Sequence, residues 1–117
     1  MKLKSISLVI FSLLLSNQLF AQYIGPGSVS TYKSVKDVIS NPVEDAHVVL
    51  EGYLTKQLNA EKYLFSDGIS EIRVEIDRDK FPMTTINEKT KIKITGEVEK
   101  EFLQSPEIDV DFVEIIR

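Results

Sequence analysis

The stretch SEIRVEID, residues 70–77, decides the fold, because apolar and charged residues alternate strictly from residue 71 onward. Ile72, Val74 and Ile76 fall on one side of an extended chain, and the charged residues between them fall on the other. This period of two predicts a β-strand with one face in a core and the other face in water. The charged turn RDK, residues 78–80, then ends the strand.

Four further stretches show the same alternation: HVVLEGYL (47–54), EKYLFSD (61–67), KIKITGEV (91–98) and EIDVDFVEII (107–116). In the last stretch the period fails after Val110, which predicts a β-bulge. Asp67-Gly68 is a typical hairpin-turn dipeptide. Five short strands joined mostly by hairpins predict an all-β protein with a small closed or nearly closed barrel. Gly52 and Gly96 are expected where strands bend around a barrel corner.

One short amphipathic helix is expected before the strands, over about residues 31–40. Its apolar residues recur at helical spacing, Ser30 or Thr31 can cap its start, and Pro42 ends it. The simplest role for the apolar side is to cap one end of the barrel, and the alternative is a docking face for a partner. The residues on this side are Tyr32, Val35, Val38 and Ile39.

Residues 1–21 have the layout of a secretory signal peptide, with the basic start MKLK, a short apolar run and a small residue at Ala21. This pattern predicts a mature domain over residues 22–117 that does not insert into a membrane once the signal is removed. The alternative is an N-terminal membrane anchor, although the apolar run is short for a membrane span.

The chain is acidic, with 14 basic and 18 acidic residues and a formal net charge of −4. Two of the basic residues and none of the acidic ones lie in residues 1–21, so residues 22–117 carry a net charge of −6. Such a charge disfavours nucleic acid and anionic lipid, and it favours cationic ligands or basic proteins. The absence of cysteine excludes thiolate catalysis and cysteine metal sites.

Six segments occur in the order typical of a known family: GPGS (25–28), VVLEGYL (48–54), YLFSDG (63–68), IRVEID (72–77), ITGEVEKE (94–101) and EIDVDFV (107–113). Together they resemble the bacterial OB-fold family, small exported proteins also described as the YgiW/YdeI stress-tolerance group. The resemblance runs from about Gly25 to Ile115. It implies a five-stranded OB-fold barrel with an N-terminal helix, a periplasmic location, a link to stress tolerance and no known enzymatic activity.

One segment departs from the family pattern. Where the family usually has tryptophan and glycine, this chain has Phe81-Pro82-Met83. Phe81 can still plug the bottom of the barrel, but a site that depends on the indole would be absent.

OB-folds bind ligands on the outward face of strands two and three, between the loops that join strands one and two and strands four and five. This rule predicts a ligand-binding face that is rich in acids and has one plausible exposed aromatic residue. Stacking of nucleic-acid bases needs several aromatic residues interleaved with basic ones, so the composition argues against nucleic acid. The predicted face contains Tyr53, Lys62, Arg73, Glu75, Asp77, Glu99 and Glu101.

The carboxylates allow a second interpretation. Glu75 with Asp77, and Asp109 with Asp111, share strand faces and could offer oxygen ligands to a hard cation. The more ordinary interpretation is that these acids solvate the open face and pair with lysines or Arg73 on neighbouring strands, the lysines being Lys91 and Lys93.

Catalysis has little support in the sequence. His47 is the single histidine, so no nucleophile–base pair can be drawn from it. Carboxylates on an open face are expected to keep ordinary pKa values, which argues against acid–base catalysis.

The sequence therefore supports a non-enzymatic periplasmic binding or adaptor module that contributes to envelope stress tolerance. Its expected partner is an envelope protein or a small cationic ligand, it needs no cofactor, and a monomer is favoured. The alternative function is a protein that binds or sequesters divalent cations with its surface carboxylates.

Overall fold

The computed structural model describes residues 32–117, so the predicted signal peptide, the predicted caps Ser30 and Thr31, and the segment GPGS lie outside the described residues. The described chain contains one α-helix, one 3-10 turn and five β-strands. The strands are β1 (His47–Gln57), β2 (Lys62–Ser66), β3 (Glu71–Glu75), β4 (Ile92–Glu99) and β5 (Glu107–Ile115).

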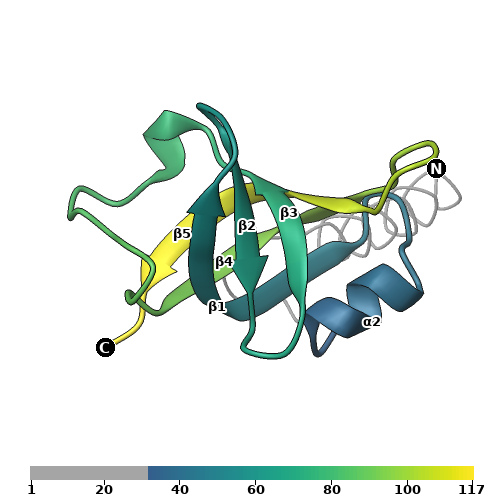
Figure 1. The fold of residues 1–117 in the computed structure, drawn as a ribbon, viewed down its shortest axis with the longest axis horizontal. Coiled ribbons are helices and arrows are strands. Elements are labelled where there is room, and N and C mark those ends of the chain that lie inside the picture. The colour runs from purple at the N-terminus through teal and green to yellow at the C-terminus, as the bar shows by residue number, and fades with distance from the viewer. Residues whose placement is uncertain (1–31) are drawn as a thin grey trace, which may run out of the picture.

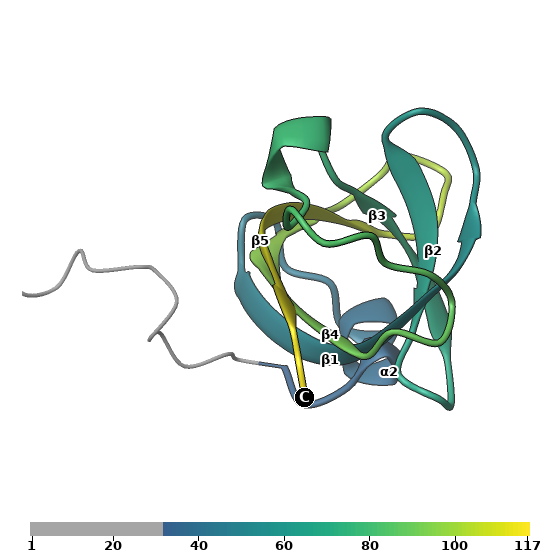
Figure 2. The same ribbon diagram turned by 90° about the vertical axis from the view of Figure 1, so that its left-hand side faces the viewer.

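The strands close into a barrel in the order β1-β2-β3-β5-β4 (Figures 1 and 2). β3 and β5 pair in parallel, and the other neighbours pair antiparallel. Pairing of β4 with β1 closes the ring, so the prediction of a small five-stranded barrel is confirmed. Closure also leaves no strand edge of this barrel open for pairing with a second chain.

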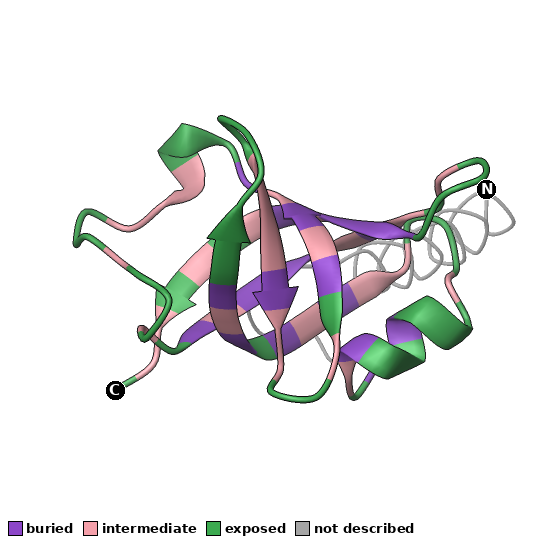
Figure 3. Cartoon of the chain, in the orientation of Figure 1, coloured by how far each residue is buried: buried purple, intermediate pink, exposed green. Residues whose placement is uncertain are grey.

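Alternate residues of β3, of β4 and of the first part of β1 point into the barrel, as the sequence pattern predicts (Figure 3). Phe65 from β2 and isoleucine and valine side chains from the other strands fill the interior. The buried hydrophobic strand residues are Val48, Leu50, Leu54, Phe65, Ile72, Val74, Ile92, Ile94, Val98, Ile108 and Val110.

The predicted bulge in the last strand is present. Thr95 pairs with Phe112 and Gly96 pairs with Val110, so Asp111 is left as the extra residue of β5. A second irregularity interrupts the β1–β2 ladder between Leu54 and Lys56.

The two strand glycines stand where neighbouring backbone passes very close. A Cβ at Gly52 would lie 2.1 Å from the Ser66 carbonyl oxygen, and one at Gly96 would lie 2.0 Å from the Asp109 carbonyl oxygen. From the sequence, we expect these glycines to allow the strands to bend. The structure shows a further reason for glycine, because neighbouring backbone leaves no room for a side chain.

Helix α2 (Val35–Ser40) is shorter than predicted and starts four residues later. Ser34 caps it, because its Oγ accepts a hydrogen bond of 3.1 Å from the Asp37 N–H, and the expectation of a cap at Ser30 or Thr31 is wrong. Serine is a strong N-cap, and Ser34 offers its side chain one turn later than the residues considered from the sequence. Asn41 ends the helix just before Pro42.

The helix caps one end of the barrel, as predicted (Figure 1). Val35 and Val38 are completely buried, and Ile39 is partly open to solvent. Tyr32 precedes the helix and is buried. Its hydroxyl donates to the Asn41 carbonyl at 2.9 Å and accepts from the Val43 N–H at 3.0 Å.

The long connection between β3 and β4, residues 76–91, lies at the opposite end of the barrel (Figure 2). It begins with the 3-10 turn η1 (Arg78–Lys80). Phe81 then packs against the core edge, with its ring centroid 5.4 Å from that of Tyr63 and the planes at 70°. This position agrees with the expectation that Phe81 plugs the bottom of the barrel.

Candidate functional site

The outward side chains of β2, β3, β5 and β4 form two neighbouring rows across the barrel wall. Because β5 lies between β3 and β4, each row crosses four strands. The first row is Lys62, Glu75, Asp109 and Glu97, and the second is Leu64, Arg73, Glu107 and Glu99. The surface that we call the acidic face consists of the charged residues of both rows together with Asp77, Glu101 and Asp111 at its margins. It holds eight carboxylates and two cationic side chains.

Glu107 is the buried centre of the acidic face, with a side chain only 2% exposed. The Lys62 ammonium nitrogen lies 2.8 Å from Glu107 Oε1, and Arg73 Nε lies 3.8 Å from the same oxygen. The hydrogen bond to Glu107 raises the pKa of Lys62. Arg73 also donates from Nη2 to the Ser105 carbonyl at 2.9 Å. These contacts tie β2 and β3 to β5 and to the loop between β4 and β5.

Three carboxylates gather beside this centre. Oxygen atoms of Glu99, Glu101 and Glu107 all lie within 4.8 Å of one another. Carboxylate oxygens in such a group are the ligands that hard divalent cations prefer. The sequence instead suggested Glu75 with Asp77, or Asp109 with Asp111, as cation ligands. The grouping found among residues 32–117 therefore uses different residues.

Three carboxylates of the acidic face, Glu97, Glu99 and Asp109, have raised pKa values. A hydrogen bond with Asp111, followed by partial burial and the nearby negative charges of Asp111 and Asp109, raises the pKa of Glu97 to about 7. Burial and then neighbouring carboxylates raise the pKa of Asp109 and of Glu99. The expectation of ordinary pKa values is therefore wrong for these three residues, because they are partly buried and lie close to other carboxylates.

The same crowding continues beyond the end of β3. A hydrogen bond with Asp77 is the main cause that raises the pKa of Glu61, which lies in the turn between β1 and β2. Asp77 also helps to raise the pKa of Asp109. The negative potential of the acidic face thus extends to the β1–β2 turn.

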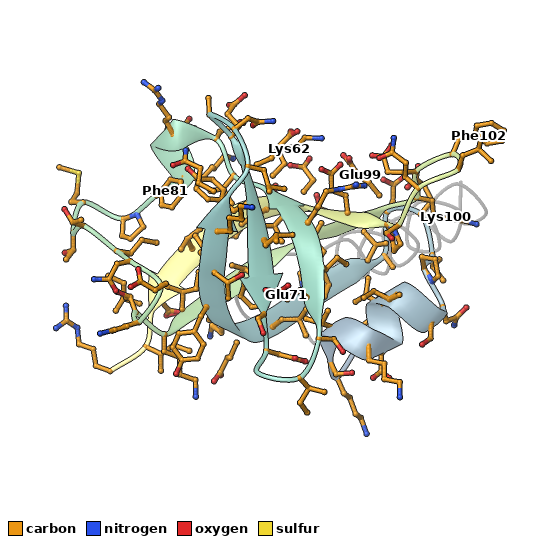
Figure 4. All side chains as sticks on the ribbon, in the orientation of Figure 1. Lys62, Glu71, Phe81, Glu99, Lys100 and Phe102 are labelled. Carbon is orange, nitrogen blue, oxygen red and sulfur yellow. The ribbon has the colours of Figure 1, made fainter. Side chains whose placement is uncertain are left out.

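The structure brings most of the predicted face together. Figure 4 shows Lys62 and Glu99 on the same side of the barrel, and the strand registers place Arg73 and Glu75 in the rows next to them. Glu101 joins Glu99 in the carboxylate group. Asp77 lies at the margin.

Tyr53 is the exception among the predicted residues. It pairs with Ser66, at the opposite end of β2 from Lys62. Four residues of extended chain separate those two ends by roughly 13 Å, so Tyr53 lies outside the acidic face.

Sequence reasoning missed that Glu97, Asp109 and Asp111 belong to this face. It assigned the site to the first three strands and the loop after the fourth, whereas the barrel continues the same wall across β5 and β4. The strand order of an OB-fold could have identified these residues, because it places the last strand beside the third.

The lysines expected to neutralise these acids pair elsewhere. Lys91 lies 3.9 Å from Glu51, and Lys93 lies 3.4 Å from Glu114. The ion pairs found among residues 32–117 include neither Glu75 nor Asp77. The prediction that these acids pair with Lys91 or Lys93 is therefore wrong, since those lysines pair with Glu51 and Glu114 outside the acidic face. Arg73 pairs with Glu107.

An apolar projection stands at the tip of the loop between β4 and β5. Phe102 and Leu103 are each 88% exposed, and Figure 4 shows Phe102 directed away from the barrel. Leu103 adopts a left-handed backbone conformation with φ 64°. Large apolar side chains held in water at a binding loop are typical of contact sites.

Within residues 32–117, no helix is long and apolar enough to cross a lipid bilayer. A closed five-stranded barrel, with a parallel β3–β5 pair and a charged face between the β1–β2 and β4–β5 loops, defines a class: the small OB-fold binding domain. The family described as bacterial OB fold (BOF) protein matches residues 20–115, and the chain belongs to this family. The resemblance seen in the sequence is confirmed.

Two relatives span much of the chain. The chain is 41% identical over 118 residues to the calcium-regulated OB-fold protein CarO of Pseudomonas aeruginosa, with 100% of both chains covered. It is 36% identical over 84 residues to protein YgiW of Escherichia coli K12, which covers 72% of this chain and 61% of YgiW. These descriptions name OB-fold or otherwise unspecified proteins and no enzyme.

Solved structures agree with the fold. The structure of E. coli YgiW superposes with a TM-score of 0.70 at 29% identity, over 80% of this chain and 97% of that one. A chain of the Stn1–Ten1 complex of S. pombe reaches a TM-score of 0.59 at 13% identity, over 76% of this chain and 78% of that one. At that identity the likeness concerns the fold alone.

Proposed function

We propose that this protein is an exported, non-enzymatic OB-fold module that contacts a cationic partner on the acidic face and so contributes to envelope stress tolerance. The partner is a basic protein segment or a small cation with several positive charges. The observation that carries the proposal is the gathering of eight carboxylates around two cationic side chains on one wall of the barrel.

The raised pKa values support this assignment physically. Carboxylates whose pKa values are raised by one another sit in a negative potential that a bound cation would relieve. Glu97, with a pKa of about 7, is partly protonated at neutral pH. Binding of a cation beside it lowers that pKa and expels the proton, so cation binding is coupled to proton release.

The first experiment is calorimetric titration with spermine and with a lysine-rich peptide at pH 7 in two buffers of different ionisation enthalpy. The expected result is binding that weakens with salt and releases protons. The double variant Glu75→Lys with Asp77→Lys should lose at least tenfold in affinity. Glu51→Lys with Glu114→Lys changes the net charge equally on exposed residues outside the face and is the matched control.

Equal weakening in both double variants would mean that only net charge matters and would overturn the assignment of the face. A crosslinking pull-down of the tagged protein from its own cell envelope, beside the same two variants, then connects the face to a physiological partner. A captured protein that is lost in the Glu75 and Asp77 variant and retained in the control is the expected outcome.

A second candidate function is divalent-cation binding by Glu99, Glu101 and Glu107. Two observations favour it: the oxygen atoms of these residues lie within 4.8 Å of one another, and a 41% identical relative is described as calcium-regulated. The Lys62 ammonium competes for the position, because it already lies 2.8 Å from Glu107. Calcium also takes six to eight oxygens, so bidentate carboxylates and water would have to complete the set.

The thermal unfolding midpoint separates the two candidates. A cation bound only by the folded state stabilises it by about 2.7 kcal/mol at a hundredfold excess over Kd. If this site binds calcium, millimolar calcium raises the midpoint, and Lys62→Met increases the rise by removing the competing ammonium. An unchanged midpoint in both proteins eliminates the second candidate.

A further inference from the structure

A second recess lies at the end of the barrel that α2 does not cover. The β3–β4 connection folds beside the last residues of β1 and encloses with them a cavity of about 630 Å³ that is open to solvent. Small-molecule sites in proteins occupy about 300–1,000 Å³, and the mouths of β-barrels are a common place for them. We call this recess the loop pocket.

The inner wall of the loop pocket is the edge of the hydrophobic core. Leu54 belongs to the core, and Tyr63, Phe81 and Ile86 are partly buried against it. The rings of Tyr63 and Phe81 meet edge to face, which holds both in place. Because apolar surface is poorly hydrated, the free energy falls when an apolar part of a ligand covers this wall and removes it from water.

The charge of the loop pocket differs from that of the acidic face. Its charged lining residues are Lys56 and Glu88, one of each sign. The remaining polar side chains are neutral amides and hydroxyls, including Gln57 and Thr85. These groups can orient a hydroxyl or carbonyl group, but they cannot neutralise a charged one. The lining therefore matches a ligand without net charge.

The loop that forms the outer wall begins and ends in a hydrogen-bonded turn. At its start, the Lys80 N–H donates to the Asp77 carbonyl at 2.9 Å within η1. At its end, Asn87 Oδ1 accepts from the Lys89 N–H at 2.9 Å, and the Asn87 N–H donates to Thr90 Oγ1 at 3.1 Å. Met83 lies fully exposed between these two turns. Met83 thus places a long, adaptable side chain at the rim of the pocket.

The β1–β2 ladder is also irregular beside the pocket. Its register shifts between Leu54 and Lys56, and the residue between them, Thr55, is part of the lining. Irregularities of this kind are concentrated at barrel rims and next to binding sites.

We propose that the loop pocket binds an uncharged small molecule that has an apolar ring system on one side and hydrogen-bonding groups on the other. The wall composition, the balanced charge and the volume together define this class of ligand. The inference goes beyond the proposed function, because it concerns a different surface and a different ligand chemistry.

The test is a fluorescence titration of the purified full-length chain with 1-aminoanthracene, an aromatic probe that is uncharged at neutral pH. One probe is expected to bind per chain, with an affinity unchanged by 0.5 M salt. The anionic probe 8-anilinonaphthalene-1-sulfonate should bind at least tenfold more weakly. Tighter binding of the anionic probe, or absence of saturable binding by the neutral one, would overturn the proposal.

Variants locate the probe. Thr85→Trp places an indole at the exposed rim of the pocket and should reduce probe affinity at least tenfold without disturbing the core. Ile69→Trp, at an exposed position in the β2–β3 turn, is the control and should leave binding unchanged. Unchanged binding in Thr85→Trp contradicts the assignment.

The two proposals can fail separately. The Glu75→Lys and Asp77→Lys variant is expected to lose cation binding and to keep probe binding. If Thr85→Trp loses cation binding as well, the two sites are not independent and the present inference is wrong.

Discussion

At the scale of single residues, Gly96 is a position without room for a side chain. The Asp109 carbonyl oxygen fills the space that any side chain would need, so alanine must push two paired strands apart. We expect Gly96→Ala to lower the free energy of unfolding by roughly 3 kcal/mol or more. Urea denaturation followed by circular dichroism measures the loss.

Gly68→Ala is the control for Gly96→Ala. Gly68 has open space around it and a φ of 97°, so its substitution strains the backbone without any collision. That strain costs about 1–2 kcal/mol. If both variants lose the same free energy of unfolding, collision with the Asp109 carbonyl oxygen is not the reason for the cost at Gly96.

The Lys62–Glu107 pair yields a second prediction at this scale. Because Glu107 is buried, removal of Lys62 leaves a carboxylate with only the more distant Arg73 to neutralise it. A double-mutant cycle with Lys62→Met and Glu107→Gln should give a coupling energy of about 1–2 kcal/mol, after allowance for the partial exposure of Lys62.

The Lys91–Glu51 pair is the control, because both side chains are about half exposed. Its coupling energy is expected to stay below about 0.5 kcal/mol. Similar values for the two pairs would argue that Glu107 is better solvated than its burial implies.

At the scale of elements, the β2–β3 turn fixes the position of α2. Asp67 accepts from the Ser70 and Ile69 N–H groups through Oδ1 and from the Val35 N–H through Oδ2 at 3.0 Å. Burial alone would raise the pKa of Asp67, but these backbone hydrogen bonds outweigh it and lower the pKa.

Asp67→Ala should therefore cost about 2 kcal/mol of stability and loosen the helix. Asp67→Asn keeps an acceptor and should cost less. Hydrogen exchange of the Val35 and Val38 amides measures the loosening. Because the pKa of Asp67 is lowered by folding, its contribution is present above pH 3.8 and is lost as the pH falls further.

The elements also show what the sequence could predict. Alternation of apolar and polar residues located all five strands, although it breaks at the bulge in β5. The start of α2 was misplaced because Tyr32 is buried like a helical residue, although it precedes the helix and is held by hydrogen bonds to Asn41 and Val43. The acidic face was only half predicted. Alternation says which side of a strand faces water, but not which strand lies beside it.

At the scale of the whole molecule, stability should fall as the pH rises through neutrality. The folded-state pKa of Glu97, about 7, exceeds its ordinary value of 4.5, so the folded chain keeps a proton that the unfolded chain loses between these values. The associated stability is present below about pH 4.5 and is lost as the pH passes 7. The raised pKa values of Glu99 and Asp109 act in the same direction.

Urea denaturation at pH 5.5 and pH 8 tests this prediction. The free energy of unfolding should be larger at pH 5.5 by roughly 1–2 kcal/mol, after allowance for solvent screening. Glu97→Gln should be more stable than the native protein at pH 8 and should reduce the difference between the two pH values. Glu114→Gln, on the same barrel but paired with Lys93, is the control and should leave the difference unchanged.

The parallel pairing of β3 with β5 also determines the order in which this barrel can assemble. When β1, β2 and β3 pair alone, they form a meander whose two outer strands each lack a neighbour. β4 supplies the neighbour of β1, and only β5, the last strand, can join β4 to β3. Contacts between such distant segments form slowly, and unpaired strands invite association with other chains. The barrel is therefore most open to association with other chains until β5 has paired with β3.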